Sequence, residues 1–275
     1  MDSIGCPGIL PDMEYPPSSG TNLARQTLQA ASGGLLEDAD ISTSSDDYAR
    51  RFAGPVGQWF IETQTRITLD LLRALPQGAS VLDVGGGHAQ ITPPLIAAGY
   101  VMTVIGSDSS CGGRLRSWID QGRCRFDVGD LRALPYPDQS FDAVVCFRLL
   151  SHSISWTGLV GELCRVARHS VVLDYPSLRS ANILSERLFT LKKGIELNTR
   201  SFLMFTPRQI GEAFAARGFT VRSEQPQFLI PMVLHRLANS VLLSRVTEAP
   251  GRLLGLTRWL GSPIIIRADR RAQRE

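Results

Sequence analysis

The chain has 275 residues, of which 43% are hydrophobic and 20% charged, and its formal net charge at pH 7 is +3. This composition is typical of a globular protein with one substantial core, and it excludes a chain that is disordered throughout. The net charge is too small to indicate a nucleic-acid partner, so none is expected. Because the five cysteines show no C-x-x-C spacing and the four histidines are scattered, neither a disulfide framework nor a metal site is predicted.

Residues 1–45 are rich in glycine, proline, serine and aspartate, and they predict a poorly ordered acidic leader. One folded domain is expected over residues 46–275. No basic-then-apolar leader opens the chain and no apolar run reaches about 18 residues. A transmembrane segment is therefore not expected, and a cytoplasmic location is the default interpretation.

The domain begins with a helical pattern. Apolar and aromatic side chains in residues 46–77 recur at helical spacing, and the Pro76-Gln77-Gly78 run then ends the pattern. The sequence predicts N-terminal helices here.

The next stretch, residues 81–88, is a short apolar strand that runs into three consecutive glycines. Glycine allows backbone N–H groups to approach a ligand closely and tolerates a positive φ angle. A second apolar run ends before Asp108, about 20 residues beyond the glycines, where a strand-end carboxylate can bind both hydroxyls of a ribose. The two elements predict a site for a nucleoside-bearing ligand.

A dinucleotide is one such ligand, but its G-x-G-x-x-G fingerprint requires a third glycine where this chain has Gln90. The stretch instead resembles the first motif of class I S-adenosylmethionine-dependent methyltransferases, an acidic residue followed by G-x-G-x-G. Asp83, Gly85 and Gly87 match this motif, and Ala89 stands in place of its last glycine. The resemblance implies S-adenosylmethionine as the cofactor and S-adenosylhomocysteine as its product.

Short apolar strands alternate with helical stretches along the chain, which is typical of βαβ units and a parallel sheet. These strands are predicted at residues 81–84, 101–106, 124–128, 141–147 and 170–175. Thr206 and Pro207 mark the start of a later helix, and Gly218 marks its end. The resemblance implies an α/β, Rossmann-like fold. Its seven-stranded, mostly parallel sheet would have helices on both faces and a last strand at residues 263–266.

Residues 126–145 are similar to the block that follows the third strand in ubiquinone/menaquinone-type small-molecule methyltransferases. By this resemblance, Asp130 contacts the adenine amino group and the Leu131 amide meets the adenine ring. Ser109 and Phe147, beside the ends of the second and fourth strands, complete the expected cofactor contacts.

Tyr48 and Phe52 match a Tyr-x-x-x-Phe element that lies over the cofactor in similar methyltransferases. The resemblance implies that they form a lid. Packing as ordinary core aromatics is an equally weighted alternative.

Methyl transfer from a sulfonium is an in-line displacement, so the enzyme mainly aligns the reactants and excludes water. A base is needed when the acceptor is a phenol, a hydroxyl or an acidic carbon. His152 follows the fourth strand and is the candidate base, because an unperturbed imidazole is largely neutral at pH 7. Packing of the turn is the alternative role for this histidine. Asp174 and Tyr175, at the end of the fifth strand, are the runners-up.

Acceptor recognition is expected in two insertions, residues 178–205 and residues 231–261, because such folds vary there. Lys192 and Lys193 in the first insertion could meet an anionic or sugar-like acceptor, and a solvated helix end is the favoured alternative. The second insertion precedes the last strand and predicts a helical pair, with one helix through residues 234–244. A cap packed on the core is favoured for it, and contact with a membrane surface or a lipid-linked acceptor is the alternative.

The predicted function is transfer of a methyl group from S-adenosylmethionine to a small-molecule acceptor, with O-methylation favoured because a candidate base is present. C-methylation of a quinone or lipid-like acceptor is one alternative, and a non-catalytic S-adenosylmethionine-binding partner subunit is another. Amino-group methylation of adenine or glutamine is disfavoured. The Phe147-Arg148-Leu149-Leu150 stretch lacks the Asn/Asp-Pro-Pro-aromatic motif used in that chemistry.

Overall fold

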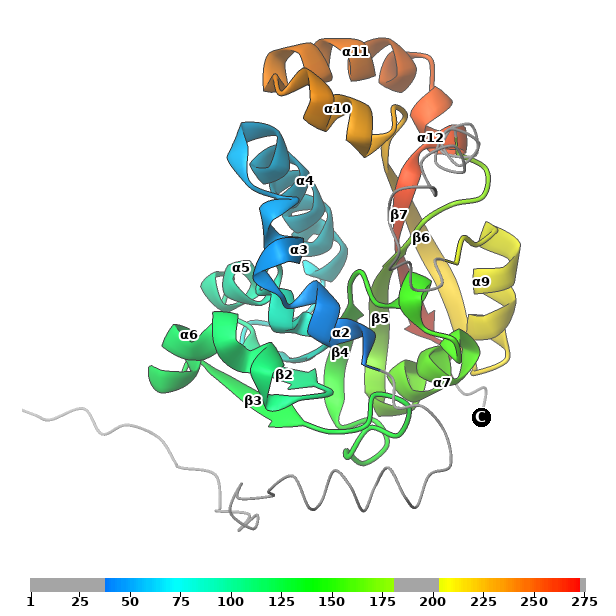
Figure 1. Ribbon diagram of the computed structural model, residues 1–275. Helices are drawn as coiled ribbons and strands as arrows, with labels where there is room; N and C mark the ends of the chain where they lie inside the picture. The colour runs from blue at the N-terminus through cyan, green and yellow to red at the C-terminus, as the bar shows by residue number, and fades with distance from the viewer. Residues whose placement is uncertain (1–37, 181–202, 273–275) are drawn as a thin grey trace, which may run out of the picture. The chain divides into compact units, whose positions relative to one another are not determined.

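The computed structural model describes residues 38–180 and 203–272 of the chain (Figure 1). Its centre is a seven-stranded sheet with the strand order β3-β2-β1-β4-β5-β7-β6. The strands are β1 Ser80–Val84, β2 Val101–Gly106, β3 Cys124–Val128, β4 Phe141–Cys146, β5 Ala167–Tyr175, β6 Phe219–Phe228 and β7 Ser262–Arg270. The first five strands, β1 to β5, pair only in parallel with one another. Strand β7 is antiparallel to both β5 and β6. The predicted mostly parallel, seven-stranded sheet is confirmed.

Each central strand is buried on both faces, which is why its sequence is a continuous apolar run rather than an alternation. In β1, Val81 lies beside Met102 of β2 and Ala143 of β4. These three side chains belong to one core cluster, whereas Leu82 belongs to the cluster on the opposite face. Successive residues of a strand point to opposite faces, so two separate cores form around one sheet.

Ten helices lie within the described ranges. They are α2 Ala39–Thr43, α3 Asp46–Arg50, α4 Gly54–Leu72, α5 Thr92–Ala97, α6 Arg116–Asp120, α7 Trp156–Val166, α9 Pro207–Ala215, α10 Met232–Ala238, α11 Val241–Leu253 and α12 Leu256–Leu260. Three short 3-10 helices are η1 Gly86–His88, η2 Ser109–Leu115 and η3 Leu150–His152. Apolar side chains of α4, α5 and α6 join the cluster on one face, and those of α7 and α9 join the other. No helix within these described ranges is long and apolar enough to cross a membrane.

Helical structure begins before residue 46, the predicted start of the domain. Residues 39–43 form α2, and Ala39 and Asp40 are fully buried there. The rest of the acidic leader, together with Lys192 and Lys193 of the first insertion, lies outside the described residues. Glu37–Glu275 form one compact unit.

The start of α9 confirms its predicted capping. The Thr206 hydroxyl accepts a hydrogen bond from the Gln209 backbone N–H, and the Gln209 side chain accepts one from the Thr206 backbone N–H. Pro207 occupies the first turn and Gly218 follows the helix with a φ of 76°. This capping box satisfies two backbone donors that the first turn would otherwise leave without partners.

The predicted helix through residues 234–244 is wrong. Helix α10 ends at Asn239, whose φ of 45° is left-handed, and α11 begins after Ser240, whose hydroxyl accepts a hydrogen bond from the Leu243 N–H. A left-handed asparagine followed by a capping serine is common turn chemistry. The continuous apolar spacing concealed this turn, and the insertion contains three helices instead of two.

Candidate active site

The glycine loop after β1 takes its shape from two different requirements. Gly85 has a φ of 73°, a conformation that glycine adopts at little cost. A Cβ atom on Gly86 would lie 2.2 Å from the Asp83 carboxylate, and one on Gly87 would lie 2.3 Å from the Ser44 hydroxyl. Gly85 is therefore needed for its backbone angle, and the next two glycines are needed for close packing.

Asp83 lies under the loop and ties β1 to the next helix. Its carboxylate accepts a hydrogen bond of 2.7 Å from the hydroxyl of Thr92, the first residue of α5. Complete burial raises the pKa of Asp83 to about 7, although the Thr92 hydrogen bond opposes this shift. The residue expected to contact the cofactor thus also holds the loop in place.

His88 is buried within the loop and is neutral at physiological pH. Burial, together with the positive charge of Arg148, lowers its pKa to about 3. Its Nδ1 atom accepts a hydrogen bond of 3.1 Å from the Gln90 N–H. The next residue, Ala89, has a φ of 55°, so an alanine occupies a left-handed position where the resembling motif has glycine. His88 therefore orients the turn.

The strand-end carboxylates lie at the same edge of the sheet as the glycine loop. Asp108 follows β2, and its Oδ1 atom accepts a hydrogen bond of 3.0 Å from the Ser110 N–H. Asp130 follows β3 and forms an ion pair of 3.1 Å with Arg132. Burial raises the pKa of Asp130, but the hydrogen bonds and charge of Arg132 outweigh this and hold it below its usual value. Leu131, the next residue, is fully buried.

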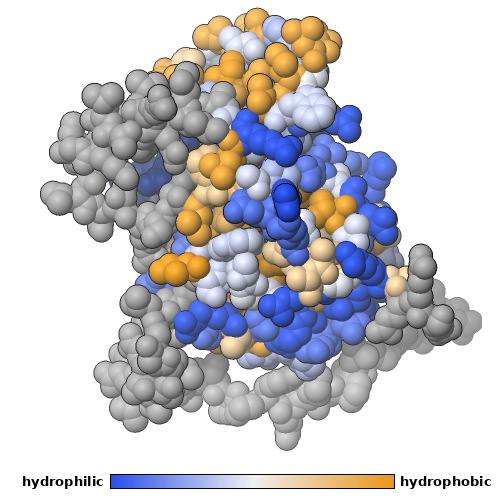
Figure 2. All heavy atoms as spheres, turned by 90° about the vertical axis from the view of Figure 1, so that its right-hand side faces the viewer, coloured by the Kyte–Doolittle hydropathy of each residue, from blue (hydrophilic) through white to orange (hydrophobic). Residues whose placement is uncertain are grey.

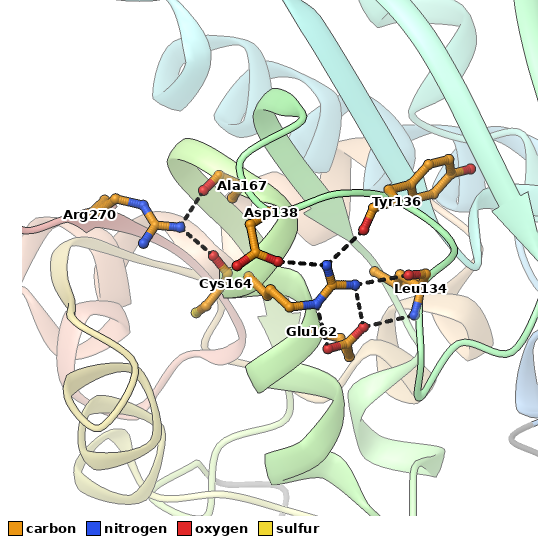
Figure 3. Close-up of polar contacts among 8 residues, drawn as sticks. Leu134, Tyr136, Asp138, Glu162, Cys164, Ala167 and Arg270 are labelled. Carbon is orange, nitrogen blue, oxygen red and sulfur yellow. Dashed lines mark hydrogen bonds and ion pairs between the residues drawn. The ribbon is translucent and has the colours of Figure 1, made fainter.

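The loop that carries Asp130 is fastened to α7 by a network that the sequence analysis missed. Arg165 donates to the Tyr136 carbonyl at 2.7 Å and to the Leu134 carbonyl at 2.8 Å. Glu162 accepts a hydrogen bond of 2.8 Å from the Leu134 N–H. Figure 3 shows these side chains and carbonyls converging on one guanidinium group. The network holds the loop between β3 and β4 against α7.

The glycine loop and η3 flank the point where the chain changes direction across the sheet. Strands β1 and β4 are neighbours, but the helix after β1 covers one face and the helix after β4 covers the other. Ligands of open α/β sheets bind at such switch points, beyond the carboxyl ends of the strands. His152 is the last residue of η3 and is half-buried there. The candidate base is thus at the predicted end of the sheet.

Arg148 links the elements around this point. It has a φ of 60°, and its backbone N–H donates to the Asp174 carboxylate at 2.6 Å. Its guanidinium donates to the side-chain oxygens of Gln90 at 2.9 Å and Gln64 at 2.6 Å. It also lies 4.1 Å above the ring of Phe52, close enough for a cation–π interaction.

The two runners-up differ from His152 in their surroundings. The buried Asp174 carboxylate is held by the Arg148 backbone, and burial raises its pKa. Burial also raises the pKa of Tyr175, so its phenol stays protonated at neutral pH. Within the described part of the chain, the Tyr175 hydroxyl has no hydrogen-bond partner. Asp174 therefore positions Arg148, and Tyr175 lacks the ionisation that a base needs.

The predicted lid aromatics, Tyr48 and Phe52, pack beside each other. The rings of Tyr48 and Phe52 are 5.7 Å apart, and Arg51 lies 5.3 Å above the Tyr48 ring. Phe52 is buried in a cluster with Trp59, whereas Tyr48 is half-buried at its edge. Phe52 is a core aromatic that also contacts Arg148 through its ring.

Helix α2 packs against the glycine loop and the end of β2. The Asp40 carboxylate accepts hydrogen bonds from the Ser107 N–H at 2.7 Å, the Ser107 hydroxyl at 2.5 Å and the Cys111 thiol at 3.3 Å. A Cβ atom on Gly85 would lie 3.5 Å from Asp40. Helix α2 therefore packs directly against the glycine loop, and we expect a ligand that binds at the loop to displace this helix.

The strand order, the antiparallel β7 and the glycine loop after β1 define the fold and site as those of a class I S-adenosylmethionine-dependent methyltransferase. Residues 59–224 match the family model described as "Methyltransferase domain". This match covers more than half of the sequence, and the chain belongs to that family.

Similar proteins agree with this assignment. The demethylmenaquinone methyltransferase of Deinococcus radiodurans is 32% identical over 103 residues, which cover 35% of this chain and 43% of the relative. The chain thus matches less than half of that relative's length. Magnesium protoporphyrin IX methyltransferase from Synechocystis PCC 6803, solved with bound SAH, has a TM-score of 0.58 at 16% identity over 86% of this chain and 98% of its own. The methyltransferase in complex with the Haloferax volcanii Trm112 activator has a TM-score of 0.57 at 15% identity, over 88% and 100% of the two chains.

Proposed function

We propose that this methyltransferase transfers the methyl group of S-adenosylmethionine to an oxygen atom of its small-molecule acceptor, with His152 as the base. The observation that supports this proposal most strongly is the position of η3. It lies across the sheet's switch point from the glycine loop and presents a half-buried histidine there. Tyr175 is protonated at neutral pH and the Asp174 carboxylate is engaged by the Arg148 N–H, so we prefer His152 as the base.

The cofactor would be held by residues at the carboxyl ends of β1 to β4. Gly85 and Gly87 allow close approach of the backbone to its amino-acid end, and Asp108 would accept hydrogen bonds from the ribose hydroxyls. Asp130 and the backbone of Leu131 would contact the adenine. Three further expected contacts lie at the same strand ends, namely Asp83, Ser109 and Phe147.

An anionic group on the acceptor is favoured by a cluster of guanidinium groups. Arg51 stacks on Tyr48, Arg148 stacks on Phe52, and Arg236 reaches the same place from α10. Burial lowers the pKa of Arg236, and the charges of Arg51 and Arg148 lower it further. None of the three forms an ion pair with an acidic residue of the described ranges. A carboxylate or phosphate on the acceptor would relieve their mutual repulsion.

The test combines binding and turnover. Calorimetric titration with S-adenosylhomocysteine measures cofactor binding, and a panel of phenols with and without a carboxylate then measures methyl transfer. His152→Ala should lower kcat by about 10²- to 10⁴-fold at saturating cofactor, the range for loss of a general base. It should leave the Kd for S-adenosylhomocysteine unchanged. His169→Ala, at an exposed histidine of β5, is the matched control and should change neither. Full turnover in His152→Ala would remove the base assignment.

C-methylation of a quinone is the second candidate, and the similarity to demethylmenaquinone methyltransferase favours it. The two chemistries give different products from the same cofactor. With a ¹³C-labelled methyl donor, the chemical shift of the transferred carbon shows whether it is bonded to oxygen or to carbon. A carbon-bound label would replace the O-methylation proposal.

A further inference from the structure

Helix α11 has its polar and apolar faces reversed. Its residues Ser244, Glu248 and Gly251 follow helical spacing on one face and are all buried against the protein. Leu242, with 75% of its surface exposed, and Leu253, with 87%, follow the same spacing on the opposite face. A helix on the surface of a globular protein normally turns its apolar stripe toward the core.

The inward orientation of the polar face is fixed by Glu248. Its carboxylate accepts hydrogen bonds from the N–H groups of Leu229 at 3.0 Å and Ile230 at 2.9 Å. It also lies 3.0 Å from Nε2 of His235, whose ring packs 5.4 Å from that of Trp59. Three polar contacts to a buried carboxylate hold α11 against α10 and β6. The outward leucines are therefore a fixed feature of the fold.

The apolar surface extends over the neighbouring helices. Leu237 of α10 is 77% exposed, and Leu254 and Trp259 at α12 are 74% and 70% exposed. Figure 2 shows hydrophobic side chains gathered at the end of the molecule that α10, α11 and α12 form. A contiguous exposed apolar surface of this kind marks an interaction site.

The charge of this surface identifies the partner. Arg245 and Arg252 of α11 and Arg258 of α12 are exposed, and the only acidic residue between residues 231 and 261 is the buried Glu248. Arg245 and Arg252 are seven residues apart and lie at the border of the apolar face of α11. Leucines and a tryptophan bordered by arginines match the two layers of a bilayer surface, acyl chains below anionic headgroups.

We infer that helices α10 to α12 dock on the surface of a membrane containing anionic lipids. The leucines enter the boundary between headgroups and acyl chains, and the arginines contact the lipid phosphates. This inference concerns binding alone and does not depend on the proposed acceptor or on His152.

Co-sedimentation of the full chain with vesicles tests it. With phosphatidylglycerol vesicles most of the protein should sediment at low salt, and the partition coefficient should be at least tenfold lower with phosphatidylcholine. Added salt should reduce binding to the anionic vesicles, because it screens the arginines. Trp259 gives a second measurement, since its fluorescence should shift to shorter wavelength on binding and the shift should be absent in Trp259→Phe.

Two double variants separate the apolar and the charged contributions. Leu242→Glu with Leu253→Glu should lower the partition coefficient at least tenfold, and Arg245→Gln with Arg252→Gln should lower it for phosphatidylglycerol only. Val101→Glu replaces an apolar residue that is 60% exposed at the start of β2, and it should bind vesicles like the wild type. Because all of these side chains are exposed, the melting temperature should not change in any variant.

Equal binding by the Leu242→Glu/Leu253→Glu variant and the wild type would overturn the inference. So would failure of the wild type to sediment with phosphatidylglycerol. A wild-type dimer that this variant converts to monomers, without vesicle binding, would assign the surface to a second copy of the chain instead.

Discussion

The glycine loop and the α10–α12 cap break the usual arrangement of side chains in opposite ways. At the loop, three ionisable side chains, Asp40, Asp83 and His88, are buried close to the glycines in space. At the cap, leucines are in solvent while a glutamate is buried. Buried polar groups and exposed apolar surfaces are the informative exceptions to the rule that apolar residues lie inside. These exceptions agree with the proposed roles, in which the loop binds a ligand and the cap docks on a membrane surface.

The largest effect expected at the loop is on the pH dependence of stability. Between about pH 4 and pH 6.5 folded Asp83, with a pKa near 7 against 3.8 for the free side chain, binds a proton that the unfolded chain releases. Its contribution to stability therefore falls as the pH rises, by at most about 4 kcal/mol at about 1.4 kcal/mol per pH unit. His88, with a pKa near 3 against 6.5, behaves oppositely and makes stability rise with pH. The two slopes are therefore expected to cancel in the wild type.

Replacing Asp83 or His88 should leave the pH dependence of stability that the other residue causes. Asp83→Asn keeps an oxygen for the Thr92 hydroxyl, and its free energy of unfolding should rise from pH 4 to pH 6.5 relative to the wild type. His88→Asn keeps an acceptor for the Gln90 N–H, and its free energy should fall over the same range. Urea denaturation at several pH values measures both curves. Arg245→Gln in the cap should follow the wild-type curve, and parallel curves for all four proteins would show that the loop buries no titrating pair.

This contrast also explains what the sequence could and could not predict. The strand and the glycine loop after it could be predicted because Asp83, Gly85 and Gly87 form a pattern within a few positions of the sequence. The roles of α2 and of Arg148 depend on contacts across many residues, such as that between Asp40 and Ser107. Such contacts leave no local pattern.

The orientation of the cap helices could not be predicted, for a different reason. Helical spacing of leucines is the same whether the apolar face points to the core or to solvent, so periodicity predicted helices without their orientation. Glu248 decides the orientation of α11. Its carboxylate contacts three polar partners, and these contacts hold the polar face of the helix against the protein. The turn at Asn239 and Ser240 is a local pattern, but the leucines on either side concealed it.

The second effect concerns the cofactor, and two aspartates should change its affinity in opposite directions. Asp108→Ala removes the expected ribose contact and should weaken binding of S-adenosylhomocysteine by about 1.5–3 kcal/mol, the range for a hydrogen bond to a charged group. Asp40→Ala removes the contacts that hold α2 over the loop. It should tighten binding, because less free energy is then needed to open the site.

Calorimetric titration of both variants measures these changes, and Asp47→Ala, at an exposed residue of α3, is the control. Weaker binding in Asp40→Ala would show that α2 holds the cofactor instead of competing with it. Unchanged binding in Asp108→Ala would remove the ribose assignment. Neither variant should alter vesicle binding, which separates the loop from the cap.

The smallest effect tests whether the loop carries backbone strain. Ala89 has a φ of 55°, and a left-handed conformation costs a residue with a Cβ atom roughly 1–2 kcal/mol. Ala89→Gly should remove this cost, although glycine gives up part of the gain because its unfolded chain is more flexible. A net increase of about 1 kcal/mol in the free energy of unfolding is expected by urea denaturation. At Gly85, which is also left-handed, Gly85→Ala should lower stability instead, since its Cβ would lie 3.1 Å from Leu149. If Ala89→Gly is destabilising, the alanine methyl group packs in the turn, and its contacts outweigh the strain of its backbone.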